Sequence, residues 1–342
     1  MKIGKRELRV GPPYIVAEIS GNHCGEIDKA IQLIEVAKWA GADAVKTQCY
    51  TPDTITLNCD RPDFLIKEGP WKDRSLYDLY TRAHTPFDWH PELYRYARST
   101  GIEIFSSVFD YTALALLEEL DCPAYKIASM EITDIPLIEA VARTGKPMII
   151  STGMATDGEV GGAFEAAVDA DANDIGLLHC VSGYPTPIEQ SNLWRIGHLY
   201  EMWPRLIIGV SDHSLGREVP MMATAMGSRI IEKHLCLSRD DVSEDADFSL
   251  EPGEFKAMVA AAHQAWAACR YNETKSEDSS RQLRRSLYVV QDMQKGEAFS
   301  PENIRSIRPG YGLPPEHLNK IVGRVAIADI ARGTALTAAL IK

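Results

Sequence analysis

The feature that most constrains the fold of this chain is a regular alternation between short apolar, β-branched runs and longer amphipathic stretches, which continues to about residue 268. Such alternation joins parallel strands through helical crossovers. The runs are almost continuously hydrophobic, as expected of strands that are covered on both faces. Eight units of this kind predict a closed (β/α)8 TIM barrel of the α/β class, with strands at 14–19, 43–48, 103–107, 124–128, 147–151, 175–180, 206–210 and 229–234.

Two parts of the chain depart from this pattern. Residues 51–86 are too long for a simple crossover and are rich in Asp, Arg, Pro and aromatic residues, which is typical of a lid or binding loop over one barrel end. Beyond the barrel domain of residues 1–268, residues 269–284 are polar and charged and are interpreted as a linker. Residues 285–342 carry short apolar runs between turns, which predicts a small β-rich domain that leans on the barrel or on a second copy.

The composition limits the partners and the compartment. Hydrophobic residues make up 45% of the 342 residues and the net charge is −12, which fits a globular protein and argues against nucleic acid or an anionic membrane as the main partner. The longest apolar stretches are too short to span a membrane, and the amino-terminal residues lack the apolar run of a signal peptide. Seven scattered cysteines without a CxxC pair favour reduced thiols. We therefore expect a cytoplasmic location.

Polar residues gather where the predicted strands end. In a barrel of this kind the catalytic groups project from the carboxyl ends of the strands, so these residues are expected to surround one site. Lysines with serine hydroxyls beside them suit an anionic substrate, because both groups bond phosphate and carboxylate oxygens. The strand-end residues are Glu18, Lys46, Gln48, Ser107, Lys126, Ser129, Glu131, Ser151, Ser182, Tyr184, Ser211, His213, Glu232 and His234.

Two of these residues have the character of metal ligands. His213 and His234 follow neighbouring predicted strands at equivalent heights, and imidazoles so placed, with carboxylates nearby, suit an open site for a divalent metal. The alternative is a pair of hydrogen-bonded histidines on the barrel rim, and the two readings stay open at this point. His179, at the end of an apolar run, is interpreted as a hydrogen-bonded core histidine.

Blocks of sequence spread over nearly the whole chain resemble the sialic acid synthase family. In order, they are AEISGNHCGEIDKA, GADAVKTQCYTPD, AYKIASMEITDIPL, ISTGMAT, HCVSGYPTPIEQSNL, SDHSLGREVP, IIEKHL and SLEP. The tail contains KGEAFSPENIRSIRPGYGL and IVGRVAIADIARGTAL, which resemble the family's C-terminal antifreeze-like (SAF) domain. The resemblance implies an enzyme that condenses phosphoenolpyruvate with an amino-sugar aldehyde.

The resemblance also implies roles for individual residues. His213 and His234 match the ligands of a manganese or magnesium ion, and Glu131 matches a carboxylate implicated in proton handling. Arg308 matches an arginine that the small domain contributes to the sugar site of the partner subunit, which implies a domain-exchanged homodimer. The implied phosphoenolpyruvate-binding residues are Lys46, Ser107 (where the family more often has Thr), Lys126, Ser129, Ser151, Ser182 and Ser211. Those implied near the sugar are Glu18, Gln48, Tyr184 and Asp245, with Glu18, Glu131 and the two histidines as catalytic groups.

One long segment points to a branch of the family. The string YTPDTITLNCDRPDFLIKEGPWKDRSLYDLYTRAHTPFDWH, together with SEDADFSLEP, resembles the branch that makes pseudaminic acid. The sugar of that branch, 2,4-diacetamido-2,4,6-trideoxy-L-altrose, lacks a 6-hydroxyl, so its site can be more apolar. Phe64, Trp71 and Phe248 would suit such a wall, although ordinary loop packing would also account for them.

Other functions stay open at this stage. Within the family, the alternative is an N-acetylneuraminate or legionaminate synthase. Outside it, Lys126 could act as the nucleophile of a Schiff-base sugar-acid lyase, which requires a desolvated lysine. The tail taken alone also allows a carbohydrate- or ice-binding protein, but such a protein has no use for lysines and histidines gathered at a barrel mouth.

Overall fold

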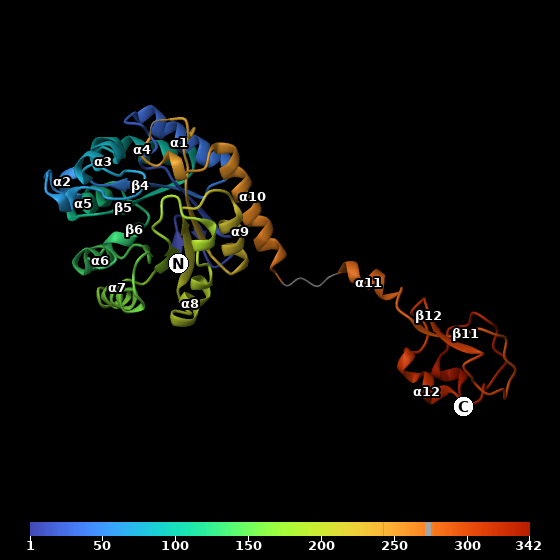
Figure 1. Cartoon of the computed structure of the whole chain (residues 1–342). Coiled ribbons are helices and arrows are strands. Elements are labelled where there is room, and N and C mark those ends of the chain that lie inside the picture. The colour runs from blue at the N-terminus through green and yellow to red at the C-terminus, as the bar shows by residue number, and fades with distance from the viewer. Residues whose placement is uncertain (242, 271–274) are drawn as a thin grey trace. The chain divides into compact units, whose positions relative to one another are not determined.

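The computed structural model describes residues 1–241, 243–270 and 275–342, in two compact units, Met1–Arg270 and Tyr271–Lys342. The first unit is a closed barrel of eight parallel strands in the order β10-β3-β4-β5-β6-β7-β8-β9 (Figure 1). The predicted (β/α)8 barrel is confirmed, with small differences at the strand ends. The strands are β3 (Tyr14–Glu18), β4 (Ala44–Cys49), β5 (Glu103–Val108), β6 (Tyr125–Ile127), β7 (Met148–Ser151), β8 (Ile175–Cys180), β9 (Ile207–Asp212) and β10 (Ile230–His234).

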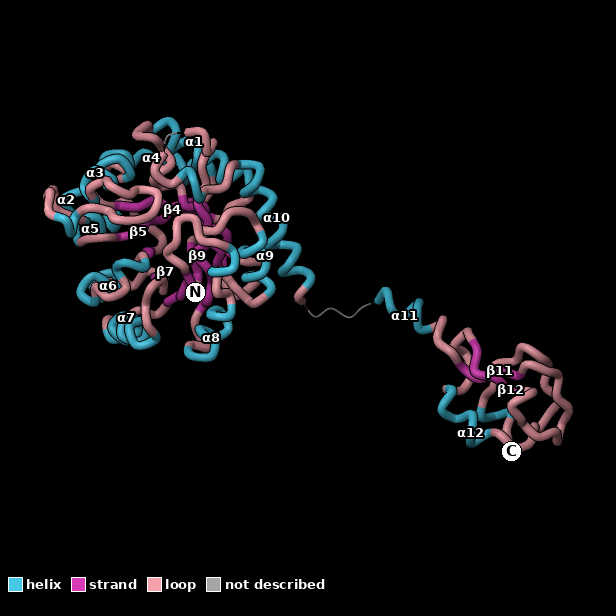
Figure 2. The backbone as a smooth tube through the Cα atoms, in the orientation of Figure 1, coloured by secondary structure: helices cyan, strands magenta, loops and turns pink. Residues whose placement is uncertain are grey.

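Helices cover the outside of this barrel, as Figure 2 shows for the cyan tubes around the magenta strands. Two of them begin at residues whose side chains cap them: in α5, Asp110 accepts a bond from the Ala113 amide, and in α7, Thr156 and Glu159 form a reciprocal capping box. The main helices are α1 (Ile27–Ala40), α4 (His90–Thr100), α5 (Tyr111–Glu119), α6 (Ile135–Ala142), α7 (Asp157–Asp169), α8 (Trp194–Met202), α9 (Glu218–Ala225) and α10 (Pro252–Ala268).

A short hairpin, β1 (Lys2–Ile3) and β2 (Arg6–Glu7), lies at the amino ends of the barrel strands. Arg6 forms an ion pair with Asp43, which directly precedes β4, and Asp43 also accepts a hydrogen bond from the Ile15 amide at 2.8 Å. Arg229, just before β10, donates to the carbonyl of Leu8. The hairpin is thus bonded to the amino end of the barrel, and the carboxyl end is left to the long loops.

The segment predicted as a lid, residues 51–86, contains α2 (Pro52–Ile55), a 3-10 turn at Pro62–Phe64 and α3 (Leu76–Ala83). It is tied to the loop that follows β10. The indole of Trp71 donates to the carbonyl of Glu244 at 3.1 Å, and Arg74 forms an ion pair of 2.6 Å with the carboxylate of the same residue. The segment is therefore anchored at the carboxyl end of the barrel.

The second unit has its own small core. The strands β11 (Ser286–Val289) and β12 (Ile304–Ile307) pair antiparallel, with α11 (Lys275–Arg281) before them and α12 (Leu318–Ile321) after them. Part of the predicted linker is thus helical, and residues 271–274 lie outside the described residues. The buried apolar residues of this unit are Leu287, Val289, Met293, Phe299, Ile304, Ile321, Ala326, Ile330 and Leu336.

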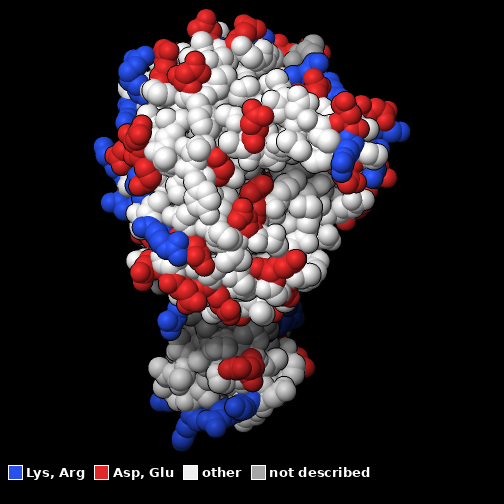
Figure 3. All heavy atoms as spheres, turned by 90° about the vertical axis from the view of Figure 1, so that its left-hand side faces the viewer, with Lys and Arg blue, Asp and Glu red and all other residues white. Residues whose placement is uncertain are grey.

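Charge is unevenly spread on the face drawn in Figure 3. On the first unit, acidic side chains occupy the middle of this face and basic side chains lie mainly toward its margins. This distribution agrees with the net charge of −12 and gives the face no broad basic area of the kind that binds nucleic acid. Among the described residues, no helix combines the length and the apolar character needed to cross a bilayer.

Candidate active site

A cavity of about 360 Å³ opens among the carboxyl ends of the barrel strands. This is the end at which barrels of this class carry their chemistry. Twelve of the residues predicted as catalytic, substrate-binding or metal-binding line it: Lys46, Gln48, Ser107, Lys126, Ser129, Glu131, Ser151, Tyr184, Ser211, His213, His234 and Asp245. The structure thus brings these side chains together, while their individual roles stay predictions.

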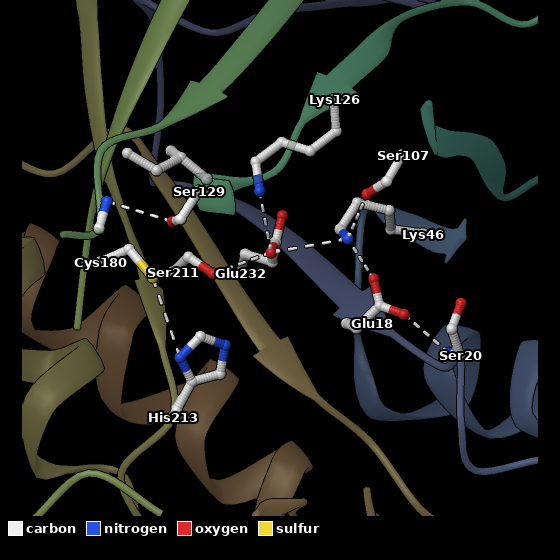
Figure 4. Close-up of polar contacts among 12 residues, drawn as sticks. Glu18, Ser20, Lys46, Ser107, Lys126, Ser129, Cys180, Ser211, His213 and Glu232 are labelled. Carbon is white, nitrogen blue, oxygen red and sulfur yellow. Dashed lines mark hydrogen bonds and ion pairs between the residues drawn. The ribbon is translucent and has the colours of Figure 1, made fainter. Parts of the chain in front are cut away.

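Lys46, Lys126 and Glu232 form the charged floor of the cavity, and Glu18 pairs with Lys46 outside the cavity lining (Figure 4). Lys46 pairs with Glu18, donates to Ser107 Oγ at 3.0 Å and lies 3.7 Å from Glu232 Oε1. Lys126 Nζ donates to the same Glu232 oxygen at 3.3 Å. All four side chains are almost completely buried. An incoming anion would therefore meet ammonium groups that are already neutralised by carboxylates, and would share them.

The shared carboxylate has unequal effects on its partners. The pKa of Glu232 is lowered to about 2, because the charges of Lys126 and Lys46 outweigh the effect of burial. Burial lowers the pKa of Lys126, and the carboxylate with which it pairs, Glu232, is shared with a second lysine. In Lys46 burial also opposes the charged form, but the charges of Glu18 and Glu232 prevail and raise the pKa. Lys46 is thus the more firmly charged lysine.

Serine hydroxyls lie beside this floor. Ser129 Oγ accepts a hydrogen bond from the Gly153 amide at 3.1 Å, and Ser211 Oγ donates to Glu232 at 2.9 Å. A Cβ atom at Gly153 would lie only 2.7 Å from the hydroxyls of both Ser129 and Ser182. The two hydroxyls can therefore approach this position only because residue 153 is a glycine. The buried hydroxyl of Ser151 has no partner among the described residues and is available to a ligand.

The two candidate metal ligands are adjacent, with ring centroids 5.3 Å apart. Strand register explains this, because Asp212 of β9 pairs with Lys233 of β10 and each histidine is the next residue. Nδ1 of His213 bonds the carbonyl of Val181 at 3.0 Å, which requires the proton on that nitrogen and leaves Nε2 for a ligand.

The donor set fits an open site for a divalent ion. Nδ1 of His234 is buried without a hydrogen bond among the described residues, and it lies 3.4 Å from a carboxylate oxygen of Asp245. In the described part of the chain, no three His, Cys, Asp or Glu side chains form a complete cluster. Two imidazoles would therefore hold the ion and leave other positions to water or substrate, as in catalytic sites.

Aromatic side chains form one wall of the cavity. The ring of Tyr184 lies 4.5 Å from that of His213 and 5.1 Å from that of Phe248, and Trp71 lies 5.6 Å from Tyr184. Trp71 and Phe248 thus line the cavity as expected for an apolar wall. The expectation for Phe64 is wrong: it lies in the 3-10 turn at Pro62–Phe64 and is not among the residues that line the cavity.

Glu131 ends a 3-10 turn at Ser129–Glu131, which follows β6 after one residue, Ala128. Its Oε2 is buried without a hydrogen-bond partner among the described residues. Burial raises the pKa of this carboxyl to about 7, although the charge of Lys126 opposes the shift. A carboxyl with a pKa near neutral can both accept and return a proton, as general acid–base catalysis requires.

Compared with a Glu131→Gln variant, which does not titrate, the wild-type protein is expected to lose stability as the pH rises. A carboxyl whose pKa is higher in the folded state stabilises that state fully below its ordinary value of 4.5, and this contribution is lost by about pH 7. The whole shift corresponds to about 3 kcal/mol. Thermal melts of both proteins from pH 4.5 to 8 measure the difference, and a pH-independent gap in Tm would contradict the raised pKa.

Three predicted residues do not line the cavity. Glu18 lies behind Lys46, and Ser182 lies beside Ser129. Arg308 is an exposed residue of the second unit, which is described by itself, so its predicted role stays a prediction. Conversely, Glu232, expected among the strand-end residues but given no individual role, lines the cavity, and so does Cys180, for which nothing was expected from the sequence.

The sequence held a signal for the role of Glu232 but none for the position of Cys180. Glu232 stands two places before His234 on one strand, and side chains two apart share a face, so that spacing was the available signal. Cys180 Sγ lies 3.9 Å from His213 Nδ1, a contact that depends on the packing of two strands. His179 bonds the carbonyl of Ser191 at 2.7 Å, in keeping with a core histidine.

Known proteins share this architecture along the chain. Residues 33–274 match the NeuB family and residues 284–342 match the SAF domain. The chain is 44% identical to pseudaminic acid synthase of Campylobacter jejuni over 94% of its own length and 95% of the relative's. It is 42% identical to pseudaminic acid synthase of Helicobacter pylori, over 96% and 97%. A crystal structure of N-acetylneuraminic acid synthetase from Leptospira borgpetersenii superposes with a TM-score of 0.71 at 30% identity, over 82% and 92% of the two chains. The chain belongs to the NeuB family.

Proposed function

We propose that this chain is a pseudaminic acid synthase, a transferase that condenses phosphoenolpyruvate with 2,4-diacetamido-2,4,6-trideoxy-L-altrose and releases phosphate. The observation that carries the proposal is the cavity floor, where buried Lys46 and Lys126 lie beside serine hydroxyls in a chain so similar to known pseudaminic acid synthases. Ammonium and hydroxyl groups together suit the phosphate and carboxylate of phosphoenolpyruvate. The aromatic wall of Trp71, Tyr184 and Phe248 suits a sugar that lacks one hydroxyl.

The reaction then needs orientation more than covalent catalysis. Carbon 3 of the enol phosphate forms a bond to the aldehyde carbon of the open-chain sugar, whose oxygen takes up a proton. Water adds at carbon 2 of the former enol and loses a proton, for which Glu131 is the proposed acceptor. The bond between carbon 2 and the phosphate oxygen then breaks, and the keto acid and phosphate leave. Lys46 and Lys126 stabilise the anionic groups throughout.

His213 and His234 are the proposed ligands of a divalent cation, Mn²⁺ or Mg²⁺. When bound, such an ion supplies Lewis-acid polarisation of the sugar aldehyde. Imidazole donors suit Mn²⁺ better than the harder Mg²⁺, which prefers oxygen. Asp245, 3.4 Å from His234, would orient that ring.

The assembly and the compartment are also proposed. Exposed apolar side chains mark four successive loops at the carboxyl end of the barrel, at Met130, Met154, Ile188 and Leu215. Exposed apolar surface around a site favours cover by a partner, which supports the predicted domain-exchanged homodimer with Arg308 of the partner subunit at the sugar. The seven free cysteines support a reducing, cytoplasmic location.

Offered two sugars side by side with phosphoenolpyruvate and Mn²⁺, the protein is expected to release phosphate only with 2,4-diacetamido-2,4,6-trideoxy-L-altrose. N-acetylmannosamine serves as the comparison because it keeps a 6-hydroxyl and lacks the second acetamido group. A colorimetric phosphate assay measures both. Turnover with N-acetylmannosamine would contradict the assignment to pseudaminic acid synthases but not the membership of the family. If neither sugar reacts, the legionaminic acid precursor is tested next, and turnover with it alone would have the same meaning.

A second candidate is a Schiff-base sugar-acid lyase with Lys126 as nucleophile. The lowered pKa of Lys126 favours it, because a neutral amine is what attacks a carbonyl carbon. The bond from Lys126 to Glu232 and the nearby Lys46 favour anion binding instead.

A further inference from the structure

The residues directly before the two histidines form a buried ion pair. Lys233 Nζ lies 2.6 Å from Asp212 Oδ2, and the exposed fractions of the two residues are 0% and 5%. Strand side chains alternate between faces, so Glu232 and His234 point into the cavity while Lys233 points away from it. Neither Lys233 nor Asp212 lines the main cavity. The pair thus lies on the opposite face of β9 and β10 from the proposed metal ligands.

The same pair also holds the loop that carries His213. The strand β9 ends at Asp212, so His213 is the first residue beyond it. Asp212 Oδ1 accepts a hydrogen bond from the Ser214 amide at 2.9 Å, and Lys233 Nζ donates to the Ser214 carbonyl. The residues on both sides of His213 are therefore fixed by one ammonium group and its carboxylate.

Lys233 links the segments that carry the two histidines. Lys233 is covalently next to His234, and through its side chain it is bonded to both neighbours of His213. One side chain thus connects the two imidazoles from behind. The hydrogen bond from the Thr186 amide to the His213 carbonyl, at 3.0 Å, supports the loop from a third direction.

We infer that Lys233 is a positioning residue for the divalent-metal site, holding the His213 loop at a fixed place relative to His234. The inference rests on the proposed function, since it takes the two histidines to be metal ligands. Groups that orient metal ligands without touching the metal typically change affinity by about 10- to 100-fold when they are removed. A buried ion pair adds little net stability compared with apolar replacements, which leaves room for a positional role.

The test is Mn²⁺ binding to the full chain without substrates, followed by the electron paramagnetic resonance signal of free Mn²⁺. In Lys233→Met, which keeps the length of the side chain, the dissociation constant is expected to rise by about 10- to 100-fold. At saturating Mn²⁺, kcat should recover toward the wild-type value, since the ligands themselves are intact. The matched control is Ser214→Ala, because that hydroxyl has no hydrogen-bond partner in the described part of the chain. Its dissociation constant should equal that of the wild type.

The Mn²⁺ titrations test the metal site and the role of Lys233 separately. If the wild-type protein binds no Mn²⁺, the proposed metal site is wrong and the inference falls with it. If the wild type binds Mn²⁺ and Lys233→Met binds it within twofold, with only a lower Tm, the pair is merely structural and the inference alone is overturned. Should Lys233→Met fail to fold, Asp212→Asn decides, because its amide oxygen can still accept from the Ser214 amide while the charge is lost. Weaker Mn²⁺ binding in that variant supports the role, and unchanged binding overturns it.

Discussion

Replacing His234 with alanine is expected to reduce phosphate release by about 10³-fold or more, because Lewis-acid assistance contributes several kcal/mol to such a reaction. The imidazole lies between the ring of His213 and Asp245, so its loss removes one of two proposed ligands. A chelator should reproduce the effect in the wild-type protein, and added Mn²⁺ should reverse the chelator but not the substitution. The measurement is the initial rate of phosphate release at saturating substrates.

The control for this experiment is His198→Gln. His198 is on the outer helix α8, where it bonds Asp157 at 3.0 Å, and it is not among the residues that line the cavity. Its rate should match that of the wild type. If His234→Ala keeps more than about a tenth of the activity, or if the chelator has no effect, the metal assignment is wrong. The anion-binding role of the cavity floor does not depend on this result, because the Lys126 variants test it.

Lys126→Met is expected to lower kcat/KM for phosphoenolpyruvate by about 10²- to 10³-fold, the size of a lost charge-assisted contact of about 3–4 kcal/mol in a buried site. The substitution also removes one of the two lysines that pair with Glu232 and leaves Lys46, at 3.7 Å, and the hydroxyl of Ser211 beside that carboxylate. A lower Tm should therefore accompany the loss of activity. Kinetics with varied phosphoenolpyruvate and a thermal melt measure both effects.

Lys126→Arg is the matched variant, and it separates anion binding from covalent catalysis. A guanidinium keeps the charge but forms no Schiff base, so the proposed synthase should retain clearly more activity in Lys126→Arg than in Lys126→Met. A lyase should lose everything in both. Borohydride reduction in the presence of pyruvate gives an independent answer, since a stable adduct at Lys126 would establish the lyase and contradict the synthase.

The barrel could be predicted from the sequence because its signal is local and repeated. Each strand is an apolar run of a few residues, and a crossover of helical pattern follows it, so the period alone fixes a parallel closed sheet. Once the strands are placed, their carboxyl ends must meet, which is why residues as distant as Lys46 and His213 could be assigned to one site.

Features that depend on packing between distant segments could not be predicted from this local sequence pattern. The central place of Glu232 follows from its side chain meeting Lys46 of β4 and Lys126 of β6 inside the closed barrel, not from its neighbours in the chain. Phe64 has the right side chain for the apolar wall, but a turn at Pro62–Phe64 sets its position. The Lys233–Asp212 pair likewise depends on strand register and on the backbone of Ser214.

The tie between the 51–86 segment and the loop after β10 has a consequence for engineering new sugar preferences. Trp71 and Phe248 come from parts of the chain separated by most of the barrel, yet their rings lie 6.1 Å apart, and Glu244 bonds both Trp71 and Arg74. A chimera that imports only one of these two loops from a relative would lose the bonds from Trp71 and Arg74 to Glu244. It would then misplace either Trp71 or Phe248 in the aromatic wall of the cavity. The two loops form one structural unit at these contacts, and they should be exchanged together.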